Sequence, residues 1–255
     1  MSDEKSLKYN EPWILQRADP YVYRHTDGSY YFTASVPAYD GIVLRRAGTL
    51  AELSGAEEVM VWKKHESGPM SYHIWAPEIH YLFGKWYIYF AGGEAEDIWK
   101  IRPYVLECSG DDPLTDEWVE LGKMKRAAED EFSFEAFSLD ATVFENKGEY
   151  YYVWAEKVGV GKMISNLYIA KMESGNQLKT VQVLLTTPDY DWERKGFWVN
   201  EGPAVIHHDG KMFLTYSASE TGVDYCVGML SIDEDADILD PRLWKKERYP
   251  VLKNL

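Results

Sequence analysis

Four hairpin-like stretches recur along this chain of 255 residues. Each has a small or acidic entry, an alternating apolar strand, a polar turn that ends in glycine, and a second strand rich in aromatic residues. The stretches are Ala18 to Ser35 (ADPYVYRHTDGSYYFTAS), Trp75 to Gly92 (WAPEIHYLFGKWYIYFAG), Leu139 to Glu156 (LDATVFENKGEYYYVWAE) and Glu201 to Ser219 (EGPAVIHHDGKMFLTYSAS). Their turn glycines are Gly28, Gly84, Gly148 and Gly210. A tight hairpin turn needs a positive φ, which glycine adopts without strain.

Two further β-like segments follow each hairpin. The third segments begin at Gly41, Arg102, Ser165 and Asp224, and the fourth, edge-like segments begin at Glu57, Glu117, Lys179 and Arg242. Helical periodicity is nearly absent, apart from one short turn expected after Thr49. Four strands in every ~60 residues are typical of propeller blades, whereas a solenoid repeats at ~20–50 residues. A plain sandwich rarely shows four matching hairpins, so we predict an all-β propeller.

The acidic balance of the chain limits its partners. The formal net charge is −15, from 42 acidic and 27 basic residues. Nucleic acids and anionic membranes are bound by basic patches, so we expect neither as a partner. Aromatic residues make up 15% of the chain, which favours strands and surfaces that stack on flat faces such as sugar rings.

The opening residues and the two cysteines predict the cellular location and the state of the thiols. The opening stretch MSDEKSLKYNEPW has no basic or apolar leader region, and no stretch approaches ~18 apolar residues. We therefore expect a cytoplasmic protein without a membrane span; a cleaved or replaced leader is the alternative. Cys108 and Cys226 have no metal-binding spacing and are expected to be reduced thiols in the core.

Acidic residues mark the entries of the repeated hairpins. In a propeller the innermost strand of each blade lines a central channel, and the strand entries converge at one end. Aligning the hairpins on their glycines gives four equivalent entry positions: Asp19, Ala76, Asp140 and Gly202. Glu201 directly precedes the last of these positions and Trp75 precedes the second. We therefore predict that Asp19, Asp140 and Glu201 meet at one pocket, with Trp75 as its apolar wall.

Two carboxyl groups that face a cleft can hydrolyse a glycosidic bond. One protonates the leaving oxygen and the other activates a water molecule. The charge of a third carboxylate raises the proton affinity of the acid, which keeps it protonated near neutral pH. Any one of these acids taken alone reads as a turn or cap residue, but three acids at repeat entries favour a shared catalytic site.

The four stretches, quoted more fully, resemble a known family. RADPYVYRHTDGSYYFTAS, HIWAPEIHY, FSLDATVFENKGEYYYVWAE and VNEGPAVIHHDGKMFLTYSAS are similar to glycoside hydrolase family 43, and within it to the α-L-arabinofuranosidases, from about Glu11 to about Pro250. The resemblance implies a five-bladed propeller that hydrolyses α-L-arabinofuranosyl or β-D-xylosyl bonds with inversion. It also implies that Asp19 is the general base, Glu201 the general acid and Asp140 the residue that orients the acid and tunes its pKa. Trp75 matches a wall of the substrate pocket.

The chain departs from the family pattern because only four hairpins are present. The fifth blade of the family carries a GHN-like stretch whose histidine lies on the channel axis, often beside calcium; His207 and His208 lie in a hairpin turn and do not match it. We therefore expect one catalytic domain over residues 1–255 that lacks its C-terminal blade. No cofactor is expected to be required and no metal ligands are assigned, since the calcium-associated histidine is absent. An incomplete ring predicts self-association, or complementation by a separate fifth-blade polypeptide.

The predicted activity is the release of terminal α-L-arabinofuranosyl residues from arabino-oligosaccharides. Two alternatives stay open at this point: a β-xylosidase of the same family, and a truncated, inactive propeller that only binds carbohydrate. Trp99, between the second hairpin and its third strand, fits either a sugar platform or core packing.

Overall fold

The computed structural model describes residues 12–160 and 162–253, and strands dominate its regular structure. The first two sheets each contain four strands in sequence order. The first sheet is made of β1 (Ala18–Arg24), β2 (Tyr30–Ser35), β3 (Gly41–Ala47) and β4 (Val59–Lys63). The second sheet is made of β5 (Tyr72–Leu82), β6 (Lys85–Glu94), β7 (Asp97–Cys108) and β8 (Val119–Lys123).

The third and fourth sheets follow the same antiparallel plan. The third contains β9 (Ser138–Asn146), β10 (Glu149–Val160), β11 (Lys162–Ser174), β12 (Gln177–Leu178) and β13 (Val183–Thr186). The fourth contains β14 (Trp198–His208), β15 (Lys211–Ala218), β16 (Cys226–Asp233), β17 (Lys245–Lys246) and β18 (Leu252–Lys253). Short 3-10 turns lie at Ala51–Ser54 (η1), Asp191–Glu193 (η2) and Pro241–Leu243 (η3). A short parallel pairing of β11 with β14 joins these two sheets, which the repeat pattern treats as separate.

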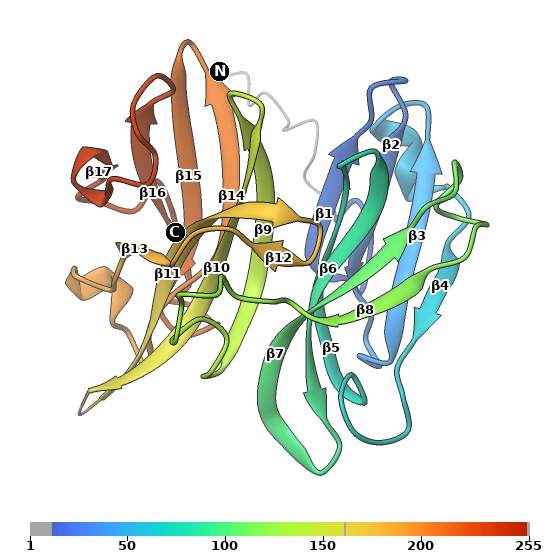
Figure 1. The fold of residues 1–255 in the computed structure, drawn as a ribbon, viewed down its shortest axis with the longest axis horizontal. Helices are drawn as coiled ribbons and strands as arrows, with labels where there is room; N and C mark the ends of the chain where they lie inside the picture. The colour runs from blue at the N-terminus through green and yellow to red at the C-terminus, as the bar shows by residue number, and fades with distance from the viewer. Residues whose placement is uncertain (1–11, 161, 254–255) are drawn as a thin grey trace, which may run out of the picture.

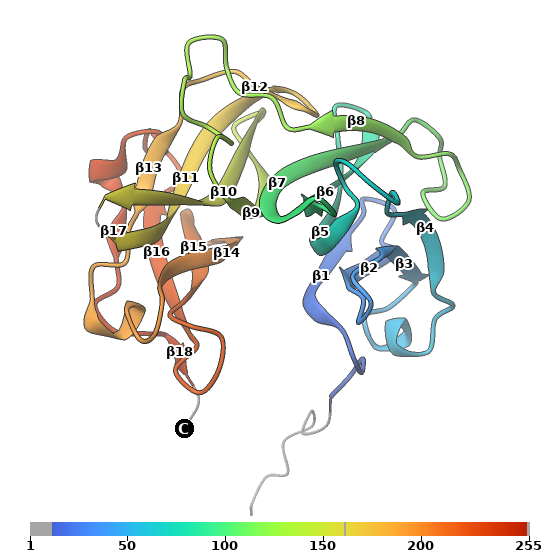
Figure 2. The same cartoon turned by 90° about the horizontal axis from the view of Figure 1, so that it is seen from below.

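The four sheets stand side by side in an arc around a common centre (Figures 1 and 2). The first strand of each sheet lies on the inner side, and these strands contact one another in the order β1, β5, β9, β14. Figure 2 shows the first and fourth sheets at the two ends of this arc. The prediction of an all-β, propeller-type fold is therefore confirmed, with four blades in the described part of the chain.

Buried apolar side chains fill the contacts between neighbouring sheets. One core cluster joins the first and second sheets, around Tyr31 and Trp86. A second joins the second and third sheets, around Tyr89 and Trp154. A third joins the third and fourth sheets and includes Tyr216. Burial of large aromatic side chains between blades, each worth a few kcal/mol, is the main force that holds the arc together.

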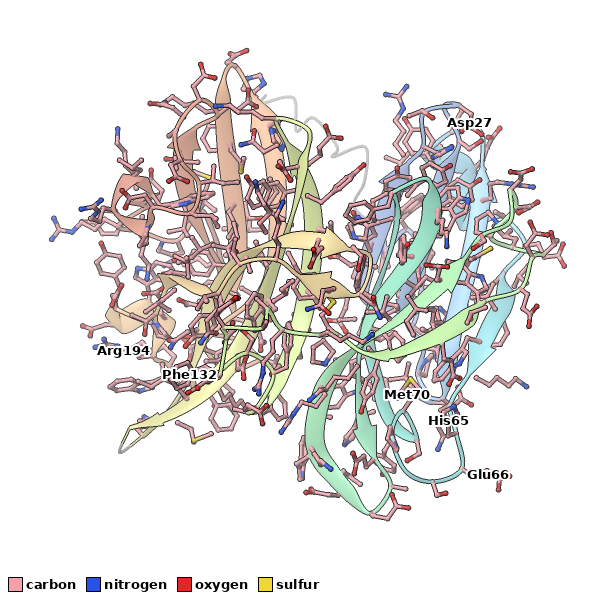
Figure 3. All side chains as sticks on the ribbon, in the orientation of Figure 1. Asp27, His65, Glu66, Met70, Phe132 and Arg194 are labelled. Carbon is pink, nitrogen blue, oxygen red and sulfur yellow. The ribbon has the colours of Figure 1, made fainter. Side chains whose placement is uncertain are left out.

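The hairpin turns have the backbone geometry that the repeat predicts. The four turn glycines Gly28, Gly84, Gly148 and Gly210 have φ of 90°, 75°, 76° and 72°. Asp27, in the β1–β2 turn, lies at the opposite end of the molecule from His65, Phe132 and Arg194 (Figure 3). Within residues 12–160 and 162–253, no helix is long and apolar enough to cross a membrane.

Candidate active site

The four hairpin entries share one unusual backbone conformation. Asp19, Ala76, Asp140 and Gly202 have φ of 48°, 45°, 50° and 55°, and each lies where the pairing of the first two strands shifts register. A bulge with a left-handed residue turns the strand and aims its side chains away from the regular ladder. The equivalence predicted from the repeats is thus confirmed, since all four blades bend at the same point.

A cavity of about 600 Å³ next to these bends is lined by all the predicted site residues. Asp19, Asp140 and Glu201 contribute carboxyl groups to its lining, and Trp75 contributes an indole. A second cavity, of about 370 Å³, is lined by Asp19 and Asp140 together with Glu78. The structure therefore brings together the four residues predicted from sequence, while their individual chemical roles stay predictions.

A serine holds Asp19 in a fixed orientation. The Ser35 hydroxyl donates to Asp19 Oδ2 at 2.8 Å and accepts the backbone N–H of Ala76 at 2.8 Å. Ser35 is buried and lies at the end of β2, whereas Ala76 is the bulge residue of the next sheet. This bridge ties the first carboxylate to the neighbouring blade and leaves its other oxygen without this constraint.

Asp140 and Glu201 are each anchored by one hydrogen bond. The backbone N–H of Gly202 donates to Asp140 Oδ2 at 3.1 Å, which connects the third sheet to the fourth. The phenol of Tyr225 donates to Glu201 Oε1 at 2.8 Å. The acid of the third sheet is therefore positioned partly through the backbone of the fourth.

Burial and mutual repulsion raise the proton affinity of this cluster. Burial raises the pKa of Asp140 well above its usual value, and the charges of Glu201 and Asp19 raise it further. Burial also raises the pKa of Glu201, and the charge of Asp19 adds to that effect. The Tyr225 hydrogen bond and the Lys157 ammonium act in the opposite direction on Glu201.

The acids Asp140 and Glu201 act on each other's pKa. The charge of Glu201 raises the pKa of Asp140. Repulsion between two carboxylates acts on both, so the charge of Asp140 also favours the protonated form of Glu201, and the tuning role given to Asp140 stays a prediction. Carboxyl groups this close share their protons, so the cluster titrates as a unit.

Aromatic side chains form the wall and the rim of the cavity. The Trp75 ring lies 4.2 Å from the His73 ring and 6.3 Å from the Trp99 ring, measured between centroids. Trp99 is 61% exposed and lines the cavity, so it belongs to the rim and not to the core. Phe197, 64% exposed, lies on the same lining. Such flat apolar surfaces suit the faces of sugar rings.

Three polar residues of the site escaped the sequence analysis. They are Ser35, Lys157 and Tyr225, which contact or face the predicted acids. Ser35 closes the first quoted hairpin and Lys157 directly follows the third, so their places in the repeat were a usable signal. Tyr225 lies in a connection before β16, and its approach to Glu201 depends on the path of that loop.

The sequence analysis assigns no metal ligands. In the described residues, no three His, Cys, Asp or Glu side chains group as a metal site. His207 pairs with Glu234 at 2.8 Å, at the end of β14 in the fourth hairpin. The assignment of His207 and His208 to a hairpin turn is therefore wrong, because both pair with β15 at the end of β14. The expectation that no cofactor is required stays a prediction. Cys108 and Cys226 are buried free thiols, as expected.

The relatives of the chain decide its family. The family model described as Glycosyl hydrolases family 43 matches residues 9–254. The chain belongs to glycosyl hydrolases family 43. An extracellular exo-α-(1→5)-L-arabinofuranosidase of Streptomyces chartreusis is 47% identical over 95% of this chain and 72% of its own length. One of the same name from Streptomyces avermitilis is 48% identical over 97% of this chain, but over only 50% of its own length.

A solved structure agrees with the family assignment. The crystal structure of an α-L-arabinofuranosidase from Lactobacillus brevis matches with a TM-score of 0.87 at 51% identity. The match covers 96% of this chain and 76% of that one. A thermostable family 43 glycoside hydrolase, only 23% identical, shares the fold with a TM-score of 0.73.

The expectation of a cytoplasmic protein is contradicted by these relatives. Both Streptomyces proteins, at 47% and 48% identity, are named extracellular enzymes. The expectation relied on the lack of a leader in the first residues, which lie outside the described part of the structure. The start of a sequence does not carry that inference, because a leader is removed from a mature protein.

Proposed function

We propose that this family 43 chain is an exo-acting α-L-arabinofuranosidase that releases terminal arabinofuranosyl residues from arabino-oligosaccharides. The observation that carries the proposal is the set of three carboxyl groups from three different blades on one cavity beside aromatic walls. The names of the relatives support the choice of sugar, since they are α-L-arabinofuranosidases at 44–51% identity. The β-xylosidase alternative has no comparable support among them.

The proposed mechanism inverts the anomeric centre in one displacement. Glu201 protonates the departing glycosidic oxygen, and burial, which raises the pKa of Glu201, keeps that proton available near neutral pH. Asp19 accepts a proton from the attacking water, with its carboxylate oriented by Ser35. Inversion predicts that a proton NMR time course detects the anomer opposite to the substrate first; the retained anomer first would contradict this mechanism.

Asp140 serves the acid without touching the leaving group in this proposal. Its carboxyl group shares the proton of the cluster, and its contact with the Gly202 N–H fixes the backbone next to Glu201. Trp75 closes one side of the pocket and packs against the sugar ring. No resident cofactor takes part in these steps.

Two substitutions test the assignment of acid and base. Glu201→Gln should lose ~10²-fold or more on arabino-oligosaccharides but far less on activated aryl arabinofuranosides, which hardly need a proton on departure. Asp19→Asn should fail on both substrates, because both need an activated water. Glu107→Gln, in β7 and outside the cavity lining, is the control. Equal losses for Glu201→Gln on both substrates would refute its role as acid.

A comparison of aryl glycosides tests the choice of sugar. Faster turnover of aryl xylosides than of aryl arabinofuranosides would favour the β-xylosidase alternative.

We also propose that the two ends of the arc take up further β-structure, from a second copy or from a separate polypeptide. Apolar side chains near the ends are exposed, among them Leu15 beside the first sheet and Ile206 in β14. Exposed apolar patches and open strand edges favour association. Analytical ultracentrifugation at micromolar concentration should detect a species larger than the 29.5 kDa chain. A strict monomer with full turnover would refute this association.

A further inference from the structure

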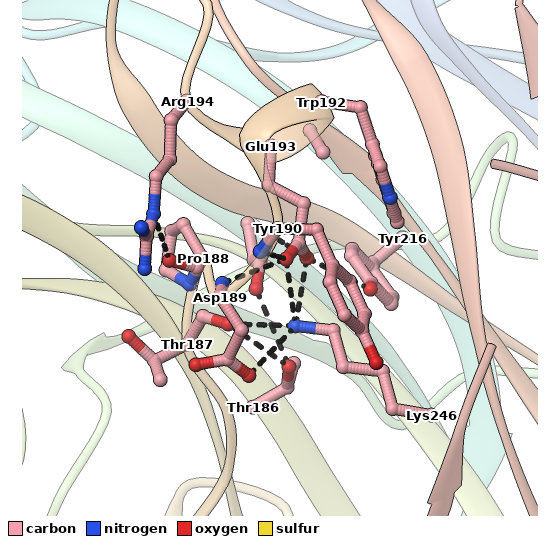
Figure 4. Close-up of polar contacts among 12 residues, drawn as sticks. Thr186, Thr187, Pro188, Asp189, Tyr190, Trp192, Glu193, Arg194, Tyr216 and Lys246 are labelled. Atoms are coloured by element: carbon pink, nitrogen blue, oxygen red, sulfur yellow. Dashed lines mark hydrogen bonds and ion pairs between the residues drawn. The ribbon is translucent and has the colours of Figure 1, made fainter. Parts of the chain in front are cut away.

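Glu193 and Lys246 form an ion pair with a fully buried carboxylate (Figure 4). It contacts Asn200 of β14, the strand that carries Glu201. Glu193, in η2, is 0% exposed. The Lys246 ammonium, from β17, lies 2.8 Å from Glu193 Oε1 and 2.9 Å from Oε2. The catalytic proposal does not use either residue, and neither lines the 600 Å³ cavity.

Four further donors bind the Glu193 carboxylate, two from the segment just before η2 and one each from β15 and β14. The N–H groups of Asp189 and Tyr190 donate to Glu193 Oε2 at 2.7 and 2.8 Å. The Tyr216 hydroxyl, from β15, donates to Oε1 at 2.9 Å. The Asn200 amide, from β14, donates to the same oxygen at 2.9 Å. With Lys246 these bonds fill the acceptor positions of the carboxylate, so its orientation is fixed.

Lys246 has a similarly complete set of partners. Its ammonium donates to the Thr187 carbonyl at 2.7 Å and to Asp189 Oδ2 at 3.1 Å, in addition to Glu193 (Figure 4). An ion pair buried only for stability gains little over apolar packing of the same volume, because removing both charges from water is costly. The position of this pair in the fold therefore calls for another explanation.

Asn200 connects the ion pair to the catalytic acid. It is 0% exposed and immediately precedes Glu201 in β14. Its backbone carbonyl accepts the Ser165 hydroxyl of β11 at 3.2 Å, so it is also held from the third sheet. Neighbouring side chains of a strand point to opposite faces. Fixing the Asn200 side chain on the buried face therefore directs Glu201 toward the cavity.

We infer that Glu193 and Lys246 are positioning residues, which hold Glu201 in place for proton transfer through Asn200. The residue that follows Glu201 is fixed as well, because the Gly202 N–H is bound to Asp140. The acid is thus held from both sides along its own strand, and its carboxyl group is held by Tyr225. Proton transfer is sensitive to small displacements, since a shift of ~1 Å can cost ~10²-fold in rate.

The test rests on the proposed function and measures a ratio: kcat on an arabino-oligosaccharide divided by kcat on an activated aryl arabinofuranoside. A misplaced acid lowers the first rate more than the second, whereas a loss of folded protein lowers both equally. Glu193→Gln should reduce this ratio by about tenfold, with little change in KM. Tyr216→Phe, which removes one donor and no charge, should give a smaller fall in the same direction.

The matched control is a second glutamate with the same kinds of partner. Glu107 accepts Lys85 at 2.6 Å and the Tyr87 hydroxyl at 2.9 Å, on β7 and away from the cavity lining. Glu107→Gln should leave the ratio unchanged. Equal losses on both substrates for Glu193→Gln and Tyr216→Phe would overturn the inference while the proposed function stands. No turnover by the parent chain, or no effect of Glu201→Gln on the ratio, would overturn both.

Discussion

Replacing Tyr225 with phenylalanine removes one hydrogen bond from the catalytic acid and leaves the ring in place. The phenol donates to Glu201 Oε1 at 2.8 Å, and it stabilises the charged form of the carboxyl group. The parent bond therefore lowers the Glu201 pKa, against the upward effects of burial and Asp19. Without the phenol, the pKa of Glu201 should rise.

The expected size of this change follows from the strength of such a bond. A hydrogen bond to a charged group contributes about 1.5–3 kcal/mol, and one pKa unit corresponds to about 1.4 kcal/mol. Because water can replace part of the lost bond, we expect the Glu201 pKa to rise by about one unit. Lys157 still faces the carboxylate and limits the change.

The pH dependence of kcat/KM provides the assay. The enzyme needs Glu201 protonated, so activity falls as pH rises through its pKa, and the basic limb of the profile should move to higher pH by about one unit in Tyr225→Phe. The plateau rate on arabino-oligosaccharides should fall several-fold, since a weaker acid protonates the leaving oxygen less readily. Tyr87→Phe, which removes a 2.9 Å bond to Glu107 instead, is the control. A basic limb that stays in place, or moves to lower pH, would refute this account of the acid.

Two further substitutions probe the same cluster. Asp140→Asn should move the basic limb to lower pH, because two carboxyl groups hold their last proton less tightly than three; an unchanged profile would assign Asp140 a purely structural role. Ser35→Ala frees Asp19 and the Ala76 N–H, so activity on both poor and activated substrates should fall by about tenfold with little change in the basic limb. A loss confined to poor substrates after Ser35→Ala would show that Ser35 acts on the acid instead.

The sequence predicts the blades well because each blade repeats a local pattern. Alternation and a turn glycine define each hairpin, and β3 begins at Gly41, where the third-segment pattern places it. The parallel pairing of Ile164 and Ser165 with Trp198 and Val199 is different. This pairing joins the third and fourth blades and is not part of the repeated pattern, so the repeats do not predict it. It depends on how far the β10–β11 hairpin extends.

The acids were predictable for the same reason, and their partners were not. Asp19 and Asp140 lie at matching repeat positions, so a single alignment places them together. Tyr225 and Glu193 come from connections that differ in every blade, and the contacts they make arise only when the loop paths are known. The rise in the pKa of both Asp140 and Glu201 depends first on their burial, which an alignment does not reveal.

The second blade shows that the bulge forms without an acidic side chain at that position. Ala76 has the same left-handed backbone, φ 45°, as Asp19 and Asp140, yet it has no functional group. The bend therefore belongs to the fold, and the reaction depends on which blades have an acid there. A left-handed conformation costs an ordinary residue about 1–2 kcal/mol, which glycine avoids at an entropic cost of about 0.5–1 kcal/mol.

Ala76→Gly should consequently stabilise the protein slightly, by up to about 1 kcal/mol in the free energy of unfolding, without weakening the Ala76 N–H bond to Ser35. Ala141→Gly is the control, because Ala141 directly follows the bulge residue Asp140 in an inner strand and is not among the residues with positive φ. There the same substitution gains no strain relief and should destabilise by about 0.5–1 kcal/mol. Urea unfolding of the two variants compares them directly. If both variants lose the same free energy of unfolding, the positive φ of Ala76 stores no strain, and this reasoning is refuted.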